Sequence, residues 1–412
     1  MKRKRLQGLF WLSVAGALVV SAGCSSGSST SSGGSGTTPS VSNVQTITVN
    51  TGPSAAAPIN EPYINGAFTS VTVCVPGGTT SCQTIGGILV DTGSSGLRIL
   101  SSALTVSLTQ QTAANGSPIV ECLPFLDGIT WGPVQTTDMT IAGEEAKSLP
   151  IQVIGSSSFS TIPSACTSFG PTLDDLTSLG ANGILGVGNF AQDCGAACTL
   201  NGAQNPGLYY TCPSSGCEVT TQSIANQVQN PVVLFAKDNN GVILELPSVT
   251  GAEASVSGSL IFGIGTESNN ALGSATVYTI DPNTGNFTTV FNNVSYTDES
   301  FIDSGSNALF FLDTQTTSIP TCMDDTSFYC PTTTQNLSAT NQGTNGSSGS
   351  VNFAVSNGDT LTSNLTDGVA NGLAGPDSGM FDWGLPFFYG RTVFTAIEGQ
   401  NTPAGVGPYW AY

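Results

Sequence analysis

Residues 86–100 read GGILVDTGSSGLRIL. Apolar, strand-forming residues lead into an Asp-Thr-Gly-Ser turn, after which the chain becomes apolar again. A single turn of this kind is typical of a hairpin. Residues 300–312, SFIDSGSNALFFL, repeat the pattern, with Asp303 standing where Asp91 stands in the first copy. The repeat predicts two similar lobes, each presenting one carboxylate on a loop.

The composition predicts a mainly β chain. The 412 residues include 50 glycines, and only 8% are charged. Short runs of Val, Ile, Thr and Phe alternate with Gly, Pro and Asn clusters, whereas long helical periodicities are scarce. We therefore expect an all-β fold with few short helices, one of them over 222–229.

The absence of histidine restricts the chemistry. The sequence contains no histidine. A Ser-His-Asp triad, a Cys-His pair and a His-ligated metal are therefore excluded. Any catalysis must use carboxylates, hydroxyls or water, and we expect no metal and no cofactor.

The N-terminus is typical of an export signal. Residues 1–23 combine the basic start MKRKR with the apolar run LFWLSVAGALVV, which is short for a membrane span. SAGC then places Cys24 as in a bacterial lipobox, although Ser21 stands where leucine is usual. We expect a lipoprotein anchored at Cys24 to the outer membrane or cell surface, followed by a Ser/Gly-rich tether over 24–45. An ordinary signal peptide cleaved nearby is the alternative.

The remaining ten cysteines predict disulfides in an exported chain. Close spacing favours two local bridges, and two further cysteines are candidates to pair with each other. The last four form a cluster of open connectivity, for which a zinc site is a less favoured alternative. The two local bridges would join Cys74 to Cys82 and Cys322 to Cys330, and the candidate pair is Cys122 and Cys166. The cluster contains Cys194, Cys198, Cys212 and Cys217.

The charge balance limits the partners. The net charge is −19, and four of the eight basic residues lie in the leader. Without the leader, four basic residues face 27 acidic ones, a net charge of −23. Such a surface repels nucleic acid and anionic lipid. We expect a monomer that binds a polypeptide and touches a membrane only through its anchor.

The paired segments VDTGSSGL and IDSGSNAL resemble the two catalytic loops of pepsin-like aspartic proteases, including a bacterial lipoprotein branch of unknown function. Further similarity lies in NGILGVG at 182–188, GSLIFGIG at 258–265 and the stretch 381–412. The resemblance implies a bilobal double β-barrel with a cleft between the lobes. The lobes are expected at 46–240 and 241–412.

The resemblance also implies roles for three pairs of residues. Two aspartates would share a proton and activate a water, which attacks a peptide carbonyl. Two hydroxyls would brace the loops, and two more would bond the outer carboxylate oxygens. These pairs are Asp91 and Asp303, Thr92 and Ser304, and Ser94 and Ser306.

Three positions depart from the family pattern. The hairpin at 122–138 offers Phe125 or Trp131 where the family's flap carries a tyrosine, and either aromatic could equally be a structural filler. Arg98 replaces the usual tryptophan; it is expected to form an ion pair with an acid or to stack on one of these aromatics. Asp382 stands where the family keeps an apolar residue.

Two functions fit these residues. The first is an exported, membrane-tethered aspartic endopeptidase, favoured by the dyad and its four hydroxyls. The second is a catalytically inactive module of the same fold that binds extended peptides or a cell-envelope partner, favoured by the altered hairpin and Arg98.

Overall fold

The computed structural model describes residues 42–53 and 62–412. The expected leader and Cys24 lie outside these residues, as does most of the expected tether. The first strand, β1 (Val44–Asn50), buries alternate side chains, including Ile47 and Val49. The tether expected to reach residue 45 therefore ends before Val44.

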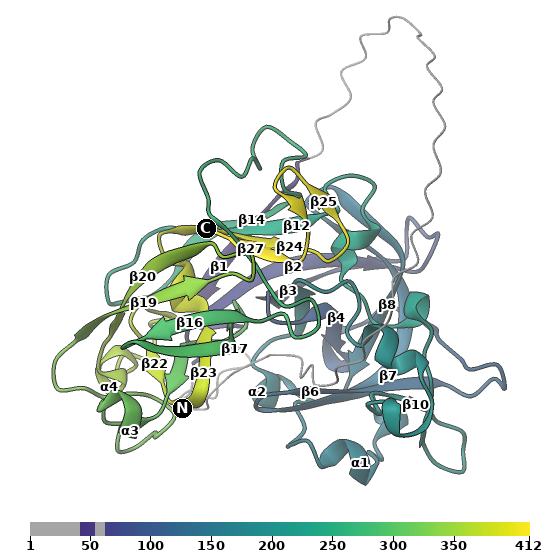
Figure 1. Cartoon of the computed structure of the whole chain (residues 1–412). Coiled ribbons are helices and arrows are strands. Elements are labelled where there is room, and N and C mark those ends of the chain that lie inside the picture. Colours follow the sequence, from purple (N-terminus) through teal and green to yellow (C-terminus); the bar gives the residue numbers. More distant parts are fainter. Residues whose placement is uncertain (1–41, 54–61) are drawn as a thin grey trace, which may run out of the picture.

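The described chain is mainly β, which confirms the predicted fold class (Figure 1). Its largest sheet has sixteen strands and curls through the first lobe and the junction between the lobes. The first-lobe strands are β2 (Gly66–Cys74), β3 (Cys82–Asp91), β4 (Ser95–Leu100), β5 (Thr109–Gln110), β6 (Ile119–Phe125), β7 (Gly128–Ile141), β8 (Glu144–Ile154), β9 (Gly183–Val187), β10 (Tyr209–Thr211) and β11 (Glu218–Val219).

The same sheet continues across the junction, where early and late segments of the chain pair. β1 lies between β2 and β14, so the chain's first strand connects the two halves. The junction strands after β1 are β14 (Val256–Phe262), β12 (Gly241–Leu246), β24 (Arg391–Ala396), β27 (Tyr409–Ala411) and β15 (Val277–Thr279).

A seven-stranded sheet forms the second lobe. Its strands are β16 (Phe287–Phe291), β17 (Val294–Ile302), β18 (Leu309–Leu312), β19 (Gln335–Gln342), β20 (Ser348–Val355), β22 (Ala374–Gly375) and β23 (Asp377–Trp383). Two small ribbons pair β13 (Ala252–Glu253) with β21 (Val369–Ala370), and β25 (Asn401–Thr402) with β26 (Gly405–Val406).

The helices of the described chain are short. The α-helices are α1 (Ser164–Thr167), α2 (Leu176–Leu179), α3 (Thr314–Thr317) and α4 (Gly358–Leu361). The 3-10 turns are η1 (Ser101–Ala103), η2 (Ser157–Phe159), η3 (Gly195–Thr199), η4 (Gly202–Gln204), η5 (Ile224–Asn226), η6 (Pro231–Leu234) and η7 (Leu385–Phe388).

The helix expected over 222–229 is wrong, because only the 3-10 turn η5 forms there. The amide of Gln222 donates to the carbonyl of Asn226, and the amide of Gln227 donates to the carbonyl of Gln222. Polar side chains thus occupy carbonyls that a helix would use, which is how such residues compete with helical hydrogen bonding.

The two lobes repeat one arrangement around the predicted loops. In the first lobe β9 lies between β3 and β4, parallel to one and antiparallel to the other. In the second lobe β23 lies in the same way between β17 and β18. Ile184 of β9 is the register partner of Leu89 and Arg98, and Asp382 of β23 is the partner of Phe301 and Phe310. Ile184 and Asp382 are therefore equivalent positions.

Packing and disulfides hold this framework together. One core cluster runs from β1 through both lobes to β27 and includes Ile47, Leu185, Phe291 and Trp383. The two disulfides expected from close spacing form, and the candidate pair Cys122 and Cys166 is also bonded. The open cluster resolves into Cys194–Cys198 and Cys212–Cys217. These bonds indicate an oxidising compartment. Within residues 42–53 and 62–412, no helix is long and apolar enough to cross a bilayer.

Candidate active site

The two predicted aspartates come together at the ends of equivalent strands. Asp91 is the last residue of β3, and Asp303 follows β17 directly. Both side chains are fully buried. A Cβ atom added at Gly93 would lie 2.5 Å from Cγ of Asp303, and one added at Gly305 would lie 2.7 Å from Cγ of Asp91. Each carboxyl therefore rests against the glycine of the opposite loop, where a larger residue would not fit.

A reciprocal set of hydrogen bonds joins the two loops. The Oγ1 of Thr92 donates to the carbonyl of Ile302 (3.2 Å) and accepts from the backbone N–H of Ser304 (2.9 Å). The Oγ of Ser304 donates to the carbonyl of Val90 (2.8 Å) and accepts from the backbone N–H of Thr92 (3.1 Å). All these partners are buried, so the four bonds fix the relative position of the two aspartates.

Each carboxyl is also held by donors of its own loop. Asp91 accepts from the N–H of Gly93 (2.8 Å) and from Oγ of Ser94 (2.5 Å). Asp303 accepts from the N–H of Gly305 (2.7 Å) and from Oγ of Ser306 (2.9 Å). These bonds fix the orientation of both carboxyl groups.

Burial raises the pKa of both aspartates. For Asp91 the negative charge of Asp303 adds to the effect of burial and raises the pKa well above its usual value. For Asp303 the effect of burial also prevails, although the hydrogen bonds from Asp91, Gly305 and Ser306 lower the pKa. Two adjacent buried carboxylates cannot both ionise cheaply, so the pair retains a proton and titrates as a unit.

The strand beneath each loop approaches it closely. A Cβ atom added at Gly186 of β9 would lie 2.8 Å from backbone atoms of Ser95, and one added at Gly384, just after β23, would lie 2.1 Å from the carbonyl oxygen of Ala308. Glycine is therefore required at both positions, as the segments NGILGVG and FDWG suggest.

The second loop carries an additional carboxyl. Asp382, which is 1% exposed, places Oδ2 2.7 Å from Oγ of Ser306. The same hydroxyl bonds Asp303. Asp382 is thus one hydroxyl away from the aspartate pair.

The 122–138 hairpin buries both of its candidate aromatics. It comprises the end of β6 and most of β7, which pair across a turn at Leu126 and Asp127. Trp131 donates its indole N–H to the carbonyl of Phe159 (2.7 Å) and packs edge-on against Tyr210, so it is held in the lobe's structure. Phe125 packs in another cluster, with Tyr63 among its members.

Arg98 forms a buried ion cluster. Its Nη2 lies 2.9 Å from Oε1 of Glu121 and 3.0 Å from Oδ2 of Asp193, and all three side chains are at most 2% exposed. The hydroxyl of Tyr209 donates to Asp193 (2.8 Å). Burial and then the charge of Glu121 raise the pKa of Asp193 well above its usual value. Arg98 therefore forms the ion pair that was one of its two expected contacts.

Two residues near the dyad were missed from sequence. After burial, the charges of Asp127, Asp91 and Asp303 raise the pKa of Tyr63. Its ring packs edge-on against Phe68, in the core cluster that also holds Phe125. Asn65 donates to the carbonyl of Asn307 (2.8 Å), the residue after Ser306. The only sequence signal is an Asn-Gly pair shortly after a tyrosine, and such pairs are common in turns that carry no function.

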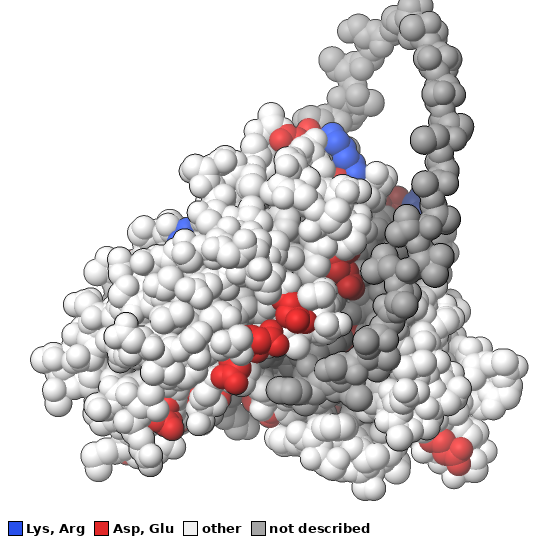
Figure 2. All heavy atoms as spheres, in the orientation of Figure 1, with Lys and Arg blue, Asp and Glu red and all other residues white. Residues whose placement is uncertain are grey.

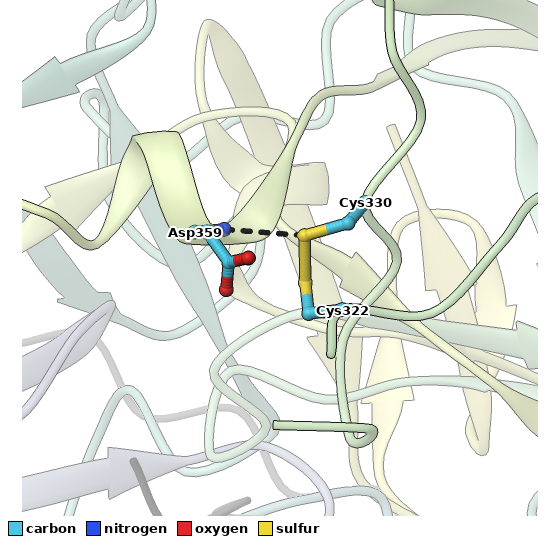
Figure 3. A group of neighbouring side chains, drawn as sticks. All are labelled: Cys322, Cys330 and Asp359. Atoms are coloured by element: carbon cyan, nitrogen blue, oxygen red, sulfur yellow. Dashed lines mark hydrogen bonds between the residues drawn. A yellow bond between two sulfur atoms is a disulfide. The ribbon is translucent and has the colours of Figure 1, made fainter. Parts of the chain in front are cut away.

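The described cysteines are not free thiols. Cys322, Cys330 and Asp359 lie close enough to suggest a metal site, but the two sulfurs are joined in a disulfide (Figure 3). The backbone N–H of Asp359 points to Sγ of Cys330 (3.4 Å). The disulfides at Cys194–Cys198 and Cys212–Cys217 likewise exclude zinc on those four thiols.

Comparison with known proteins identifies a family but no activity. No curated protein matches the chain at a significant level. The sequence model described as "Protein of unknown function (DUF3443)" matches residues 39–412, and the chain therefore belongs to this family.

Proposed function

We propose that this protein is an aspartic endopeptidase of the pepsin-like type. The observation that carries the proposal is the buried pair Asp91 and Asp303, each packed against the glycine of the opposite loop, on two equivalent loops joined by reciprocal hydroxyl bonds. A structural role alone does not account for two carboxyls placed where each raises the cost of ionising the other.

In this proposal the pair holds one proton. The ionised carboxyl takes a proton from a water, which attacks the peptide carbonyl, while the protonated carboxyl donates to the forming oxyanion. The hydroxyls of Ser94 and Ser306 keep the outer oxygens occupied, so the shared edge remains for water. Thr92 and Ser304 keep the two carboxyls at a fixed distance, on which the shared proton depends.

The test is cleavage of a reduced, unfolded protein by the product of the full reading frame, purified from the cell envelope, between about pH 3 and pH 7. We expect activity on the acid side. Asp91→Asn and Asp303→Asn should each lower it about a thousandfold or more, because the mechanism needs two titratable carboxyls. Asp324→Asn, at an exposed aspartate of the second lobe, is the matched control. Equal activity in all four proteins would refute the proposal.

The alternative is a peptide-binding module without catalysis. Arg98 in a closed ion cluster and a hairpin without a tyrosine favour it, because both change the surroundings of the site in that family. A wild-type protein that binds an extended peptide or a statine-type inhibitor but cleaves nothing would establish it.

The same proposal places the protein outside the cytoplasm, on a lipid anchor at Cys24. The described cysteines are paired in disulfides, which fits an exported chain. The face in Figure 2 shows acidic side chains crossing the middle of the molecule and few basic ones, which favours a polypeptide over nucleic acid as partner. Mass spectrometry of the N-terminal peptide decides whether Cys24 is acylated.

A further inference from the structure

A second pocket lies in the second lobe, between its sheet and the turn η7. Its volume is about 600 Å³, which falls in the range of small-molecule sites. Residues of β19 and β20 line one side, and β20 is an edge strand of the seven-stranded sheet. The aspartates of the candidate active site, Asp91 and Asp303, do not line it. The pocket is therefore distinct from the dyad.

One wall of this pocket is aromatic. Phe353 packs edge-on against Trp383, with ring centroids 5.3 Å apart, and the ring of Trp383 lies 5.5 Å from that of Phe387. Trp383 and Phe387 are buried, whereas Phe353 on β20 is half-buried. A wall of this kind favours a ligand that carries a ring or another apolar group.

The charge of the pocket is opposite to that of the protein. Arg391, the first residue of β24, is its one charged lining residue among those that the structure describes. The whole chain has 27 acidic residues against eight basic ones. Glu245 on the neighbouring strand β12 bonds Thr392 at 3.0 Å. Side chains alternate along a strand, so Arg391 points to the face of β24 opposite to Thr392 and Glu245.

Arg391 is held in place by neutral groups. Its Nη1 donates to the carbonyl of Phe387, and its Nη2 donates to the carbonyl of Asn352 (3.3 Å). The guanidinium lies over the ring of Phe387, 4.5 Å from the centroid. It carries more N–H groups than these two carbonyls use, and it forms no ion pair within the described chain. Burial accordingly lowers the pKa of Arg391, and no carboxylate raises it again.

We propose that this pocket binds a small organic acid, whose carboxylate pairs with Arg391 and whose ring or other apolar body packs on Phe353 and Phe387. The guanidinium is already oriented by two backbone carbonyls and an aromatic ring, so little side-chain freedom is lost on binding. A carboxylate also supplies the counter-charge that this cation lacks, through charge-assisted hydrogen bonds. The acidic surface elsewhere opposes an anion only weakly at physiological salt, where the screening length is about 8 Å.

Two probes of nearly the same shape but different charge test the site. 3-Phenylpropionate carries a carboxylate on an aromatic body, and 3-phenylpropionamide is its neutral counterpart. Their dissociation constants are measured by ligand-observed NMR titration of the full-length protein at about pH 7, where the acid is ionised. We expect the acid to bind the wild type about tenfold more tightly than the amide, or better. Equal affinity for the two probes would overturn the inference without any variant.

Two variants locate the carboxylate. Arg391→Gln keeps a polar side chain but removes the charge, so the affinity for the acid should fall about tenfold, to that for the amide. Lys237→Gln removes a more exposed cation, which pairs with Glu267, and should bind the acid as the wild type does. Unchanged binding of the acid by Arg391→Gln would contradict the inference, because the carboxylate would then lie elsewhere.

A third probe separates two sources of the carboxylate. A tetrapeptide that ends in phenylalanine with a free C-terminus presents the same chemical groups at a peptide end. Affinity no tighter than that of 3-phenylpropionate supports a free acid as the ligand. Binding about tenfold tighter, and lost in Arg391→Gln, would replace the free acid by a peptide end. None of these measurements uses cleavage, so absence of peptidase activity would overturn the proposed function alone.

Discussion

The two lobes repeat one backbone arrangement but bury opposite charges behind their loops. Arg98 on β4 and Phe310 on β18 hold equivalent registers, as do Ile184 on β9 and Asp382 on β23. The first lobe thus has a cation with an aliphatic neighbour, and the second has an acid with an aromatic neighbour. The symmetry of the loops depends on backbone bonds and four hydroxyl contacts, whereas the side chains behind them are free to differ.

The difference shows how each lobe compensates a buried charge. In the first lobe the charge of Arg98 is neutralised by Glu121 and Asp193, which lie elsewhere in the chain. None of the hydrogen bonds described above connects this ion cluster to the dyad. In the second lobe Asp382 is connected to the dyad, because it bonds the serine that bonds Asp303. We therefore expect changes at Arg98 to affect stability and changes at Asp382 to affect the position of the Ser306 hydroxyl beside Asp303.

Arg98→Ala should produce the largest loss of stability. Removing the guanidinium leaves Glu121 and Asp193 buried without their cation, and such a loss typically costs about 3–5 kcal/mol. The measurement is the unfolding free energy from denaturant titration near neutral pH. Arg391→Ala is the control at the junction between the lobes, because Arg391 packs over Phe387 at 4.5 Å without an ion pair in the described chain. An equal loss of unfolding free energy in both variants would show that the ion cluster contributes no more to stability than the packing of Arg391.

The pH dependence of stability should be the next largest effect. Burial is the first cause that raises the pKa of Asp91, Asp193, Asp303 and Glu398. A raised pKa in the folded state gives stability that is fully present below the unfolded pKa and is lost as pH rises through the folded pKa. The unfolding free energy should therefore fall as pH rises from about 4.5 to 7, by about 1.4 kcal/mol for each proton retained per unit of pH.

Denaturant midpoints at these two pH values measure the effect. Asp193→Asn tests whether the first lobe contributes, because it removes a carboxyl whose pKa is raised within the Arg98 cluster. Its slope with pH should be shallower than that of the wild type. A wild-type midpoint that is higher at pH 7 than at pH 4.5 would contradict the prediction.

The sequence predicted what lies within one loop and missed what the fold assembles. The motif alone placed Asp91, Thr92 and Ser94, because their contacts lie within a turn or across its repeated copy. The partners of Arg98 are 23 and 95 positions away, at Glu121 and Asp193. Among 27 acidic residues nothing in the sequence marks these two. The link from Asp382 to Asp303 was missed for the same reason, since it depends on β23 lying between β17 and β18.

The false helix at 222–229 has a different origin. Local composition allowed a helix there, but the glutamine amides bond backbone carbonyls instead. The cysteine cluster was likewise undetermined, because four cysteines allow three pairings and spacing does not choose among them. The partners of these glutamine and cysteine side chains depend on tertiary packing, which cannot be read from a single sequence.

The smallest predicted effect concerns the contact that makes the two loops equivalent. Thr92→Ala and Ser304→Ala each remove a buried hydroxyl that accepts one backbone N–H of the opposite loop and donates to one carbonyl there. Each change should cost about 1–3 kcal/mol, because it leaves buried polar groups without a partner. If the loops act as one unit, the double variant should lose less than the sum, by about 0.5 kcal/mol or more.

Thr84→Ala is the matched control, because Thr84 bonds Thr72 at 2.7 Å on the surface of the first lobe. It should change the unfolding free energy by less than about 0.5 kcal/mol. Strict additivity of Thr92→Ala and Ser304→Ala would mean that each loop keeps its shape without the other. The equivalence of the lobes would then come from their sheets alone, and the hydroxyl contacts would only adjust the distance between Asp91 and Asp303.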